Sequence, residues 1–199
     1  MSILARQLDL AQFFSVVVGW LVFGAVFVFR RRPPQARPQA RDRRALVGIG
    51  FQGVAYAMVW ALRRPLAPAE APASGVAIAE AVLVLLFMAT SLVLSYTAVN
   101  TLGKQWSVAA QVVESHELVT SGPYAWVRNP IYTAMTGMLI ATGLAVSTLS
   151  VLVAAVVFSL IGILIRVRLE ERLLRARFGE QYEEYARRVP ALLPRLPHT

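Results

Sequence analysis

The sequence contains no cysteine and few acidic residues. The lack of cysteine excludes a disulfide framework, a thiolate nucleophile and a zinc site built on cysteines. Only 11 of the 199 residues are Asp or Glu, against 20 Lys and Arg, so the formal net charge is +9. Charged residues make up 16% of the chain, whereas 57% of it is hydrophobic. A soluble protein of this size does not hide so much apolar surface, and we expect lipid to cover part of it.

Long hydrophobic runs are present instead. Three of them, residues 10–29, 45–62 and 76–99, are about as long as the roughly 20 residues that cross a membrane. A fourth run, residues 131–165, has 35 residues without a charge. A single helix of that length would extend about 52 Å, so two short helices with a turn near residues 143–150 fit better. The sequence therefore predicts an all-α, polytopic membrane protein with five transmembrane helices, the last two forming a short helical hairpin.

The distribution of the arginines predicts the orientation of these helices. With five spans, 17 of the 20 Lys and Arg fall on one face of the membrane, and cytoplasmic loops carry such an excess. We therefore expect the N-terminus outside and the C-terminus in the cytoplasm. The Pro- and Arg-rich segment 30–44 lacks the interleaved aromatic residues on which bases stack, so we interpret it as a cytoplasmic loop and expect no nucleic-acid partner. We expect a single integral membrane domain over residues 1–199, with three membrane helices in residues 1–99 and a catalytic core in residues 100–199.

The glycines Gly48, Gly50 and Gly53 match the G-x-G-x-x-G fingerprint of dinucleotide sites. That fingerprint requires a preceding strand, whereas here it lies inside a predicted membrane helix. We interpret the glycines as small residues at helix–helix contacts. The two histidines, His116 and His198, do not form a credible metal set, so no metal site is predicted.

Two cytoplasmic segments hold nearly all of the unusual polar residues. In the first, residues 100–132, Pro130 fits the first turn of the next membrane helix, where its missing N–H has no cost. Asn129 then lies at the N-cap position. Arg128 has two interpretations: an interfacial arginine whose charge reaches the headgroups, or a guanidinium fork that binds a carboxylate.

The second segment, residues 166–188, is predicted to be a helix that leaves the membrane and continues at the cytoplasmic face. It contains two adjacent acids, Glu170 and Glu171. Adjacent helical residues point about 100° apart, so at most one of the two is expected to face a given ligand. Solvation, or pairing with nearby arginines, is the simpler interpretation of both.

These segments resemble those of the isoprenylcysteine carboxyl methyltransferase family, a phospholipid methyltransferase-like group of integral membrane methyltransferases. The string HELVTSGPYAWVRNPIY at residues 116–132 resembles the family's H-x-L-V-T-x-G-P-Y-x-x-V-R-H-P-x-Y segment. The string LGKQWS at residues 102–107 is similar to its L-G-x-x-W-S element. Residues 168–190, with RLEERLL, FGEQYEEY and VP, resemble its R-x-E-E-x-x-L…F-G-x-x-Y-x-x-Y…P end. The resemblance covers about half of the chain and keeps the three motifs in order.

The resemblance implies a methyltransferase that uses S-adenosylmethionine at the cytoplasmic face. Its substrate would be a membrane-dissolved amphiphile with a carboxylate, as in isoprenylcysteine-type O-methylation, or a lipid amine. The cofactor pocket would be formed by the cytoplasmic loop and the C-terminal helix. Carried onto this sequence, the cofactor-binding residues are His116, Leu118, Val119, Gly122, Pro123, Tyr124, Asn129, Pro130, Tyr132, Glu170 and Glu171, and the catalytic candidates are Arg128, Arg168 and Glu171.

One departure from the family pattern concerns Asn129, which stands where the family has a histidine. An asparagine does not take up a proton near neutral pH, so this position is not a general base here. Two other functions stay open: a sterol-reductase-like membrane protein that binds NADPH, and a non-catalytic membrane binding protein. The adjacent glutamates favour the methyltransferase, because the extra phosphate of NADPH would prefer arginines in their place.

Overall fold

The structure, a computed structural model, describes residues 5–29, 45–67, 74–103 and 118–194, and the regular structure there is helical. The helices are α1 (Ala5–Phe29), α2 (Ala45–Ala61), α3 (Gly75–Leu102), the short 3-10 helix η2 (Gly122–Ala125), α4 (Pro130–Val146), α5 (Leu149–Phe178) and α6 (Glu180–Arg188). The predicted all-α fold is thus confirmed over the described residues. The predicted cofactor residue His116 lies outside them.

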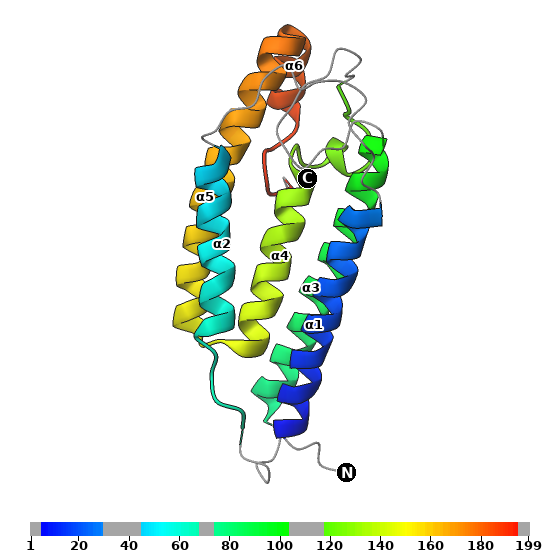
Figure 1. The fold of residues 1–199 in the computed structure, drawn as a ribbon. Coiled ribbons are helices and arrows are strands. Elements are labelled where there is room, and N and C mark those ends of the chain that lie inside the picture. Colours follow the sequence, from blue (N-terminus) through cyan, green and yellow to red (C-terminus); the bar gives the residue numbers. More distant parts are fainter. Residues whose placement is uncertain (1–4, 30–44, 68–73, 104–117, 195–199) are drawn as a thin grey trace.

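The helix α4 lies at the centre of the bundle (Figure 1). Helices α2 and α5 pack against each other on one side of α4, and α1 packs against α3 on the other side. Each of these four helices also contacts α4. The motif-bearing helix α4 is therefore held from both sides, and α5 contacts both α2 and α4.

The outer surface of the bundle is that of a protein surrounded by lipid. Helices α1, α3 and α5 are long and apolar enough to cross a membrane, and α2 and α4 are shorter apolar helices. Large apolar side chains point outward, among them Phe14, Leu21 and Val93, whose exposed fractions are 62%, 70% and 64%. Soluble proteins do not expose contiguous apolar surface on this scale. The chain is an integral membrane protein.

The long apolar run breaks into two helices, as predicted. The helix α4 ends at Val146 and α5 begins at Leu149, inside the predicted turn. The hydroxyl of Ser147 donates to the carbonyl of Val59 at the end of α2, with an O–O distance of 2.8 Å. The turn between α4 and α5 is thereby fixed to α2.

The second of these helices is longer than the predicted short hairpin. Its charge-free part ends at Ile165, but the helix continues without interruption to Phe178 and has 30 residues. Gly179 ends it with a φ of +51°, a conformation that glycine adopts without steric cost. The predicted extension beyond the membrane is therefore the second half of α5, and it is rigidly coupled to the apolar half.

Two aromatic residues join the outer helices to α4 inside the bundle. The indole Nε1 of Trp20 donates to the hydroxyl of Thr142 at 3.0 Å. The hydroxyl of Tyr56 donates to the carbonyl of Met135 at 3.1 Å, and the two aromatic rings meet edge to face with centroids 5.0 Å apart. Helices α1 and α2 are thus both hydrogen-bonded to α4.

Backbones approach closely where α2 crosses α5. A Cβ atom at Gly162 would lie 2.5 Å from the carbonyl oxygen of Gly48, and one at Gly48 would lie 2.7 Å from that of Gly162. The interpretation of the glycine motif as a helix–helix contact is confirmed for Gly48. It is wrong for Gly50 and Gly53, where an added Cβ would meet nothing within 4 Å.

Charged residues tie α1, α3 and the connection after α2 together at the other end of the bundle. Arg64 donates to Glu80 at 2.8 Å and lies 3.4 Å from a carboxylate oxygen of Asp9. This cluster is far from the motif residues, which gather at the opposite end.

Candidate functional site

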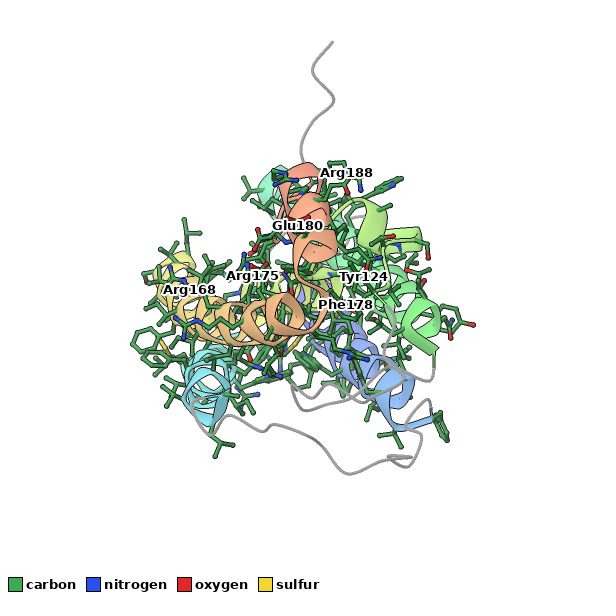
Figure 2. All side chains as sticks on the ribbon, turned by 90° about the horizontal axis from the view of Figure 1, so that it is seen from above. Tyr124, Arg168, Arg175, Phe178, Glu180 and Arg188 are labelled. Carbon is green, nitrogen blue, oxygen red and sulfur yellow. The ribbon has the colours of Figure 1, made fainter. Side chains whose placement is uncertain are left out.

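The motif segments of the sequence meet at one end of the bundle, where η2, the start of α4, the second half of α5 and α6 come together (Figure 1). Figure 2 looks down on this end and shows α5 running across the view, with α6 above it in the picture and with Tyr124 and Arg175 toward the middle. Residues far apart in the sequence become neighbours here, and most of the described site residues form one cluster.

Arg128 and Glu171 form an ion pair at the centre of this cluster. Oε1 of Glu171 accepts hydrogen bonds from Nε of Arg128 at 3.0 Å and from Nη2 at 2.8 Å. The two side chains are only 13% and 9% exposed. The second oxygen of Glu171, Oε2, accepts from Arg175 at 3.2 Å. Both oxygens of this carboxylate are therefore engaged by arginines.

Arg128 also binds the chain around the end of α6. Its Nη1 donates to the carbonyls of Ala186 at 2.7 Å and Val189 at 2.6 Å. A guanidinium has five N–H donors, and the four bonds to Glu171 and these two carbonyls use four of them. Bidentate binding of another carboxylate needs two free N–H donors, and only one remains. This arrangement therefore favours a structural role for Arg128.

Glu170 lies in a different environment from its neighbour. Its Oε1 accepts a hydrogen bond from the hydroxyl of Tyr132 and lies 3.6 Å from Arg166. The guanidinium of Arg166 also covers the ring of Tyr132, 5.1 Å from the centroid. Burial raises the pKa of the Glu170 carboxyl above its usual range, while the Tyr132 hydroxyl and Arg166 act in the opposite direction.

The two adjacent glutamates thus divide their contacts, as the helical geometry predicts. The side chain of Glu171 is 9% exposed and points at the arginines of the cluster, whereas that of Glu170 is 25% exposed. The hydrogen bond from Tyr132 and the closest approach of Arg166 both fall on Oε1 of Glu170. Glu170 therefore keeps more acceptor capacity for a ligand than Glu171, which already accepts three hydrogen bonds.

The G-P-Y stretch forms η2, which begins at Gly122 with a φ of +58°. A Cβ at Gly122 would lie 2.8 Å from the hydroxyl oxygen of Thr101 in α3, so both the conformation and the space require glycine. Tyr124 is buried, and its carbonyl accepts the hydroxyl of Tyr185 in α6 at 2.7 Å. The turn is thereby joined to α3 on one side and to α6 on the other.

The tyrosines of α6 form a small apolar cluster at the site. Tyr182 and Tyr185 are 1% and 5% exposed, and Val189 packs with them. Leu118, predicted to contact the cofactor, packs against the same cluster. Burial raises the pKa of Tyr185 to about 12, so its hydroxyl stays protonated and keeps its bond to η2 at any physiological pH.

The segment that follows α6 lies along the start of α4. The backbone N–H of Arg128 donates to the carbonyl of Pro190 at 2.8 Å. The backbone N–H and the side-chain Nδ2 of Asn129 both donate to the carbonyl of Ala191, each at 3.1 Å. Asn129 occupies the N-cap position as predicted, but its side chain makes no capping bond, because its amide group is turned to Ala191.

Not every predicted site residue joins the cluster. Arg168 is exposed on α5, toward the outer edge of this end of the molecule (Figure 2). Val119 and Pro123 are half-buried. Among the described residues there is no group of three His, Asp or Glu side chains able to hold a metal ion.

Two parts of this cluster are not among the predicted site residues. Arg166 is the first: it is one of the nearby arginines expected to pair with the glutamates, and it does lie four residues before Glu170, a spacing that brings side chains together on a helix, but it is not among the predicted site residues. It also reaches toward the amide oxygen of Gln52 in α2, at 3.5 Å. The second part is the set of backbone carbonyls after α6, for which side-chain patterns carry no signal.

Fold and site together define an all-helical integral membrane protein with its polar chemistry gathered at one end of the bundle. Comparison with protein families assigns this class more narrowly. The phospholipid methyltransferase family matches residues 79–181, which is more than half of the chain and includes α3 after its first turn, η2, α4 and α5. The chain belongs to the phospholipid methyltransferase family.

Individual relatives match about half of the chain. The cobalt-zinc-cadmium resistance protein CzcN of Cupriavidus metallidurans is 38% identical over 100 residues, which cover 48% of this chain and 44% of the relative. The protein-S-isoprenylcysteine O-methyltransferase of Schizosaccharomyces pombe is 33% identical over 93 residues, 45% of this chain and 38% of the relative. Protein-S-isoprenylcysteine O-methyltransferase B of Arabidopsis thaliana is 34% identical over 107 residues, 51% and 53% respectively. The matched region thus spans about two fifths to one half of these relatives.

Proposed function

We propose that this protein is a methyltransferase that uses S-adenosylmethionine to methylate a lipophilic substrate dissolved in the membrane. Membership of the phospholipid methyltransferase family supports methyl transfer. The observation that carries the proposal is the cluster around Tyr132 and Glu170, because it joins the two motifs that resemble the cofactor site of isoprenylcysteine methyltransferases.

The described residues fit this cofactor chemically. Oε2 of Glu170 is the acceptor that the two hydroxyls of a ribose require, since an ionised carboxylate only accepts hydrogen bonds. The apolar groups of Leu118 and Val119 suit the faces of an adenine, and Gly122 to Tyr124 shape the adjoining turn. When bound, S-adenosylmethionine supplies a methyl group on a positively charged sulfur.

The role of the chain is to hold and orient the reactants rather than to form a covalent intermediate. Tyr132 fixes Glu170 by its hydrogen bond, and the Arg128–Glu171 pair fixes the rotation of α5 against α4 and α6. We therefore assign Arg128 and Glu171 to positioning and Glu170 to cofactor contact. Arg168 has no part in the proposed chemistry, because it is exposed at the edge of the site.

We propose that the reacting group of the substrate is a carboxylate. Two of the relatives are named protein-S-isoprenylcysteine O-methyltransferases. A carboxylate carries no proton that must be removed before attack, so it requires no general base. This agrees with Asn129, which cannot be a base, and with Glu171, whose oxygens are both engaged. A poorly solvated pocket would also favour the neutralisation of charge during attack on the sulfonium.

We propose further that all five helices from α1 to α5 cross the membrane, with the N-terminus outside and the site at the cytoplasmic face. Helices α2 and α4 have 17 residues each, about 26 Å at 1.5 Å per residue, slightly less than the hydrocarbon core of about 30 Å. The chain has no cysteine, so single cysteines at Leu66 and Glu184 can be labelled with an impermeant maleimide. In right-side-out vesicles we expect labelling at position 66 but not at 184, and the reverse would refute the orientation.

Calorimetric titration of the detergent-purified protein tests the activity class. We expect binding of S-adenosylhomocysteine and no binding of NADPH. Glu170→Ala should weaken the binding of S-adenosylhomocysteine, while Glu184→Ala on the exposed face of α6 should leave it unchanged. Binding of neither compound by folded protein would overturn the proposal, and binding of NADPH alone would point to a reductase.

The reacting group is tested separately with radiolabelled S-adenosylmethionine and lipid extracts. A methyl ester releases its label as methanol in mild alkali, whereas an N-methyl group keeps it. We expect alkali-labile label, and alkali-stable label would show that the reacting group is not a carboxylate.

A further inference from the structure

We propose that Asn129 is a positioning residue whose side chain acts only as a hydrogen-bond donor, and that this donor is what the position requires. The inference rests on the proposed function. It concerns the one place where the sequence departs from the family pattern, an asparagine in place of a histidine, and it explains that departure by a contact in this chain.

The contact is with the segment after α6. Two donors of Asn129, the backbone N–H and the side-chain Nδ2, converge on the single carbonyl of Ala191 at 3.1 Å each. The neighbouring bonds continue along the same segment. The backbone N–H of Arg128 donates to the carbonyl of Pro190 at 2.8 Å, and the hydroxyl of Thr133 donates to the carbonyl of Leu192 at 2.6 Å. Three successive carbonyls are thus bound by the start of α4.

This pairing connects position 129 to the cofactor cluster. Leu192 packs against the group formed by Tyr132, Ile163 and Val167, where the first turn of α4 meets α5. A loss of the bond at Ala191 would loosen the segment and with it the first turn of α4, which carries the hydroxyl donor to Glu170. Asn129 therefore acts on the site through Tyr132 rather than by touching a reacting atom.

A histidine at this position would preserve the contact. The nitrogen Nδ1 of histidine and Nδ2 of asparagine are both bonded directly to Cγ, so either places an N–H donor at the same point of the side chain. An aspartate has the same shape as asparagine but places an acceptor oxygen there, facing the carbonyl of Ala191. The pair Asn129→His and Asn129→Asp therefore separates a donor requirement from a requirement for size.

The first readout is the affinity for S-adenosylhomocysteine. We expect Asn129→His to stay within about threefold of the native protein and Asn129→Asp to bind about tenfold more weakly or worse, because a lost hydrogen bond leaves a carbonyl facing a carboxylate. Thr133→Val, which removes the neighbouring bond to Leu192, should weaken binding in the same direction. Native affinity in Asn129→Asp would overturn the inference.

The second readout does not depend on the ligand. Hydrogen exchange of the backbone amides of Arg128 and Asn129, which donate to the segment, should be as slow in Asn129→His as in the native protein and faster in Asn129→Asp. If the native protein binds no S-adenosylhomocysteine while this pattern holds, the proposed function fails and the positioning contact stands. Equal exchange in all three proteins would refute the contact.

The third readout is the pH profile of turnover. A donor role predicts that the profile of Asn129→His has the same shape as that of the native protein. If the histidine instead adds a limb near its usual pKa of about 6.5 and raises the rate above it, position 129 contributes as a base and the inference is wrong.

Discussion

Replacing Glu171 by glutamine should destabilise the fold strongly, although the residue lies in a motif that resembles the family's cofactor site. The substitution keeps the shape of the side chain and removes its charge. Arg128 would then lie 13% exposed without a counter-charge on its Nε and Nη2. Breaking a buried ion pair costs about 3–5 kcal/mol, and we expect the lower end, about 3 kcal/mol, because Arg128 keeps its carbonyl partners Ala186 and Val189.

The assay is thermal unfolding of the purified protein in detergent. For a chain of this length a loss of about 3 kcal/mol lowers the Tm by roughly 6–12 °C. The matched control is Glu184→Gln, because Glu184 forms an ion pair with Arg188 in which the side chains are 62% and 70% exposed. Such a pair contributes about 0–1 kcal/mol, so the Tm of this variant should change little.

A double-mutant cycle assigns the loss to the pair itself. Arg128→Met leaves two carbonyls unpaired and should cost at least as much as Glu171→Gln. The double variant should be more stable than the sum of the single losses predicts, by about 2 kcal/mol, because neither charge is then left alone. Arg128→Lys should also lower the Tm, since an ammonium does not reproduce the fork. If Arg128→Lys abolished turnover and kept the native Tm, the arginine would act on substrate and the structural assignment would be refuted.

Three further outcomes are expected. Gly162→Ala should lower the Tm, since an overpacked contact costs about 1–3 kcal/mol, while Gly50→Ala on the lipid side should not; equal Tm values would contradict the close crossing. Under the proposed function, affinity for S-adenosylhomocysteine should fall as the pH drops, because the proposed contact is with the carboxylate form of Glu170 and burial raises the pKa of this group. Since the deprotonated form is the one proposed to bind, the loss of affinity should begin at a higher pH than for an ordinary glutamate. Glu170→Gln should abolish the pH dependence that comes from this carboxyl. An affinity that calorimetry finds independent of pH would contradict the contact. Arg64→Gln should cost about 1 kcal/mol and leave this affinity unchanged, because its ion pairs lie at the other end of the bundle; weaker binding would show that the two ends are coupled.

The helices were predictable because membrane crossing imposes a length. A run of 35 apolar residues is too long for one crossing, and it breaks between Val146 and Leu149. The same argument did not reveal that α5 would run on to Phe178, since a span sets the length of the apolar part only. Nor does it tell which helices pair. Helix pairing depends on local fit, such as the close approach of Gly48 to Gly162. Of the three glycines in the pattern, only Gly48 takes part in such a contact.

The site was predictable where side chains carry the signal. The motifs identified Tyr132 and Glu170, and the structure places them in contact. The sequence did not predict that Arg128 would bind Glu171 and two carbonyls, because a bond to a carbonyl leaves no trace in the identity of the accepting residue. The same holds for the carbonyl of Ala191, which any residue type would offer.

The adjacent glutamates act as one unit because they lie on one rigid helix. Arg128 grips Glu171 from the start of α4 and so sets the rotation of α5. A rotation of α5 by about 100° about its axis would exchange the positions of neighbouring residues. The ion pair of Arg128 with Glu171 therefore orients Glu170 toward the hydroxyl of Tyr132. Loss of Glu171 should therefore weaken cofactor binding only by way of Glu170. It follows that Glu171→Gln should reduce affinity in the native background and have little further effect when Glu170 is already alanine. Independent losses would mean that the two carboxylates each touch the ligand.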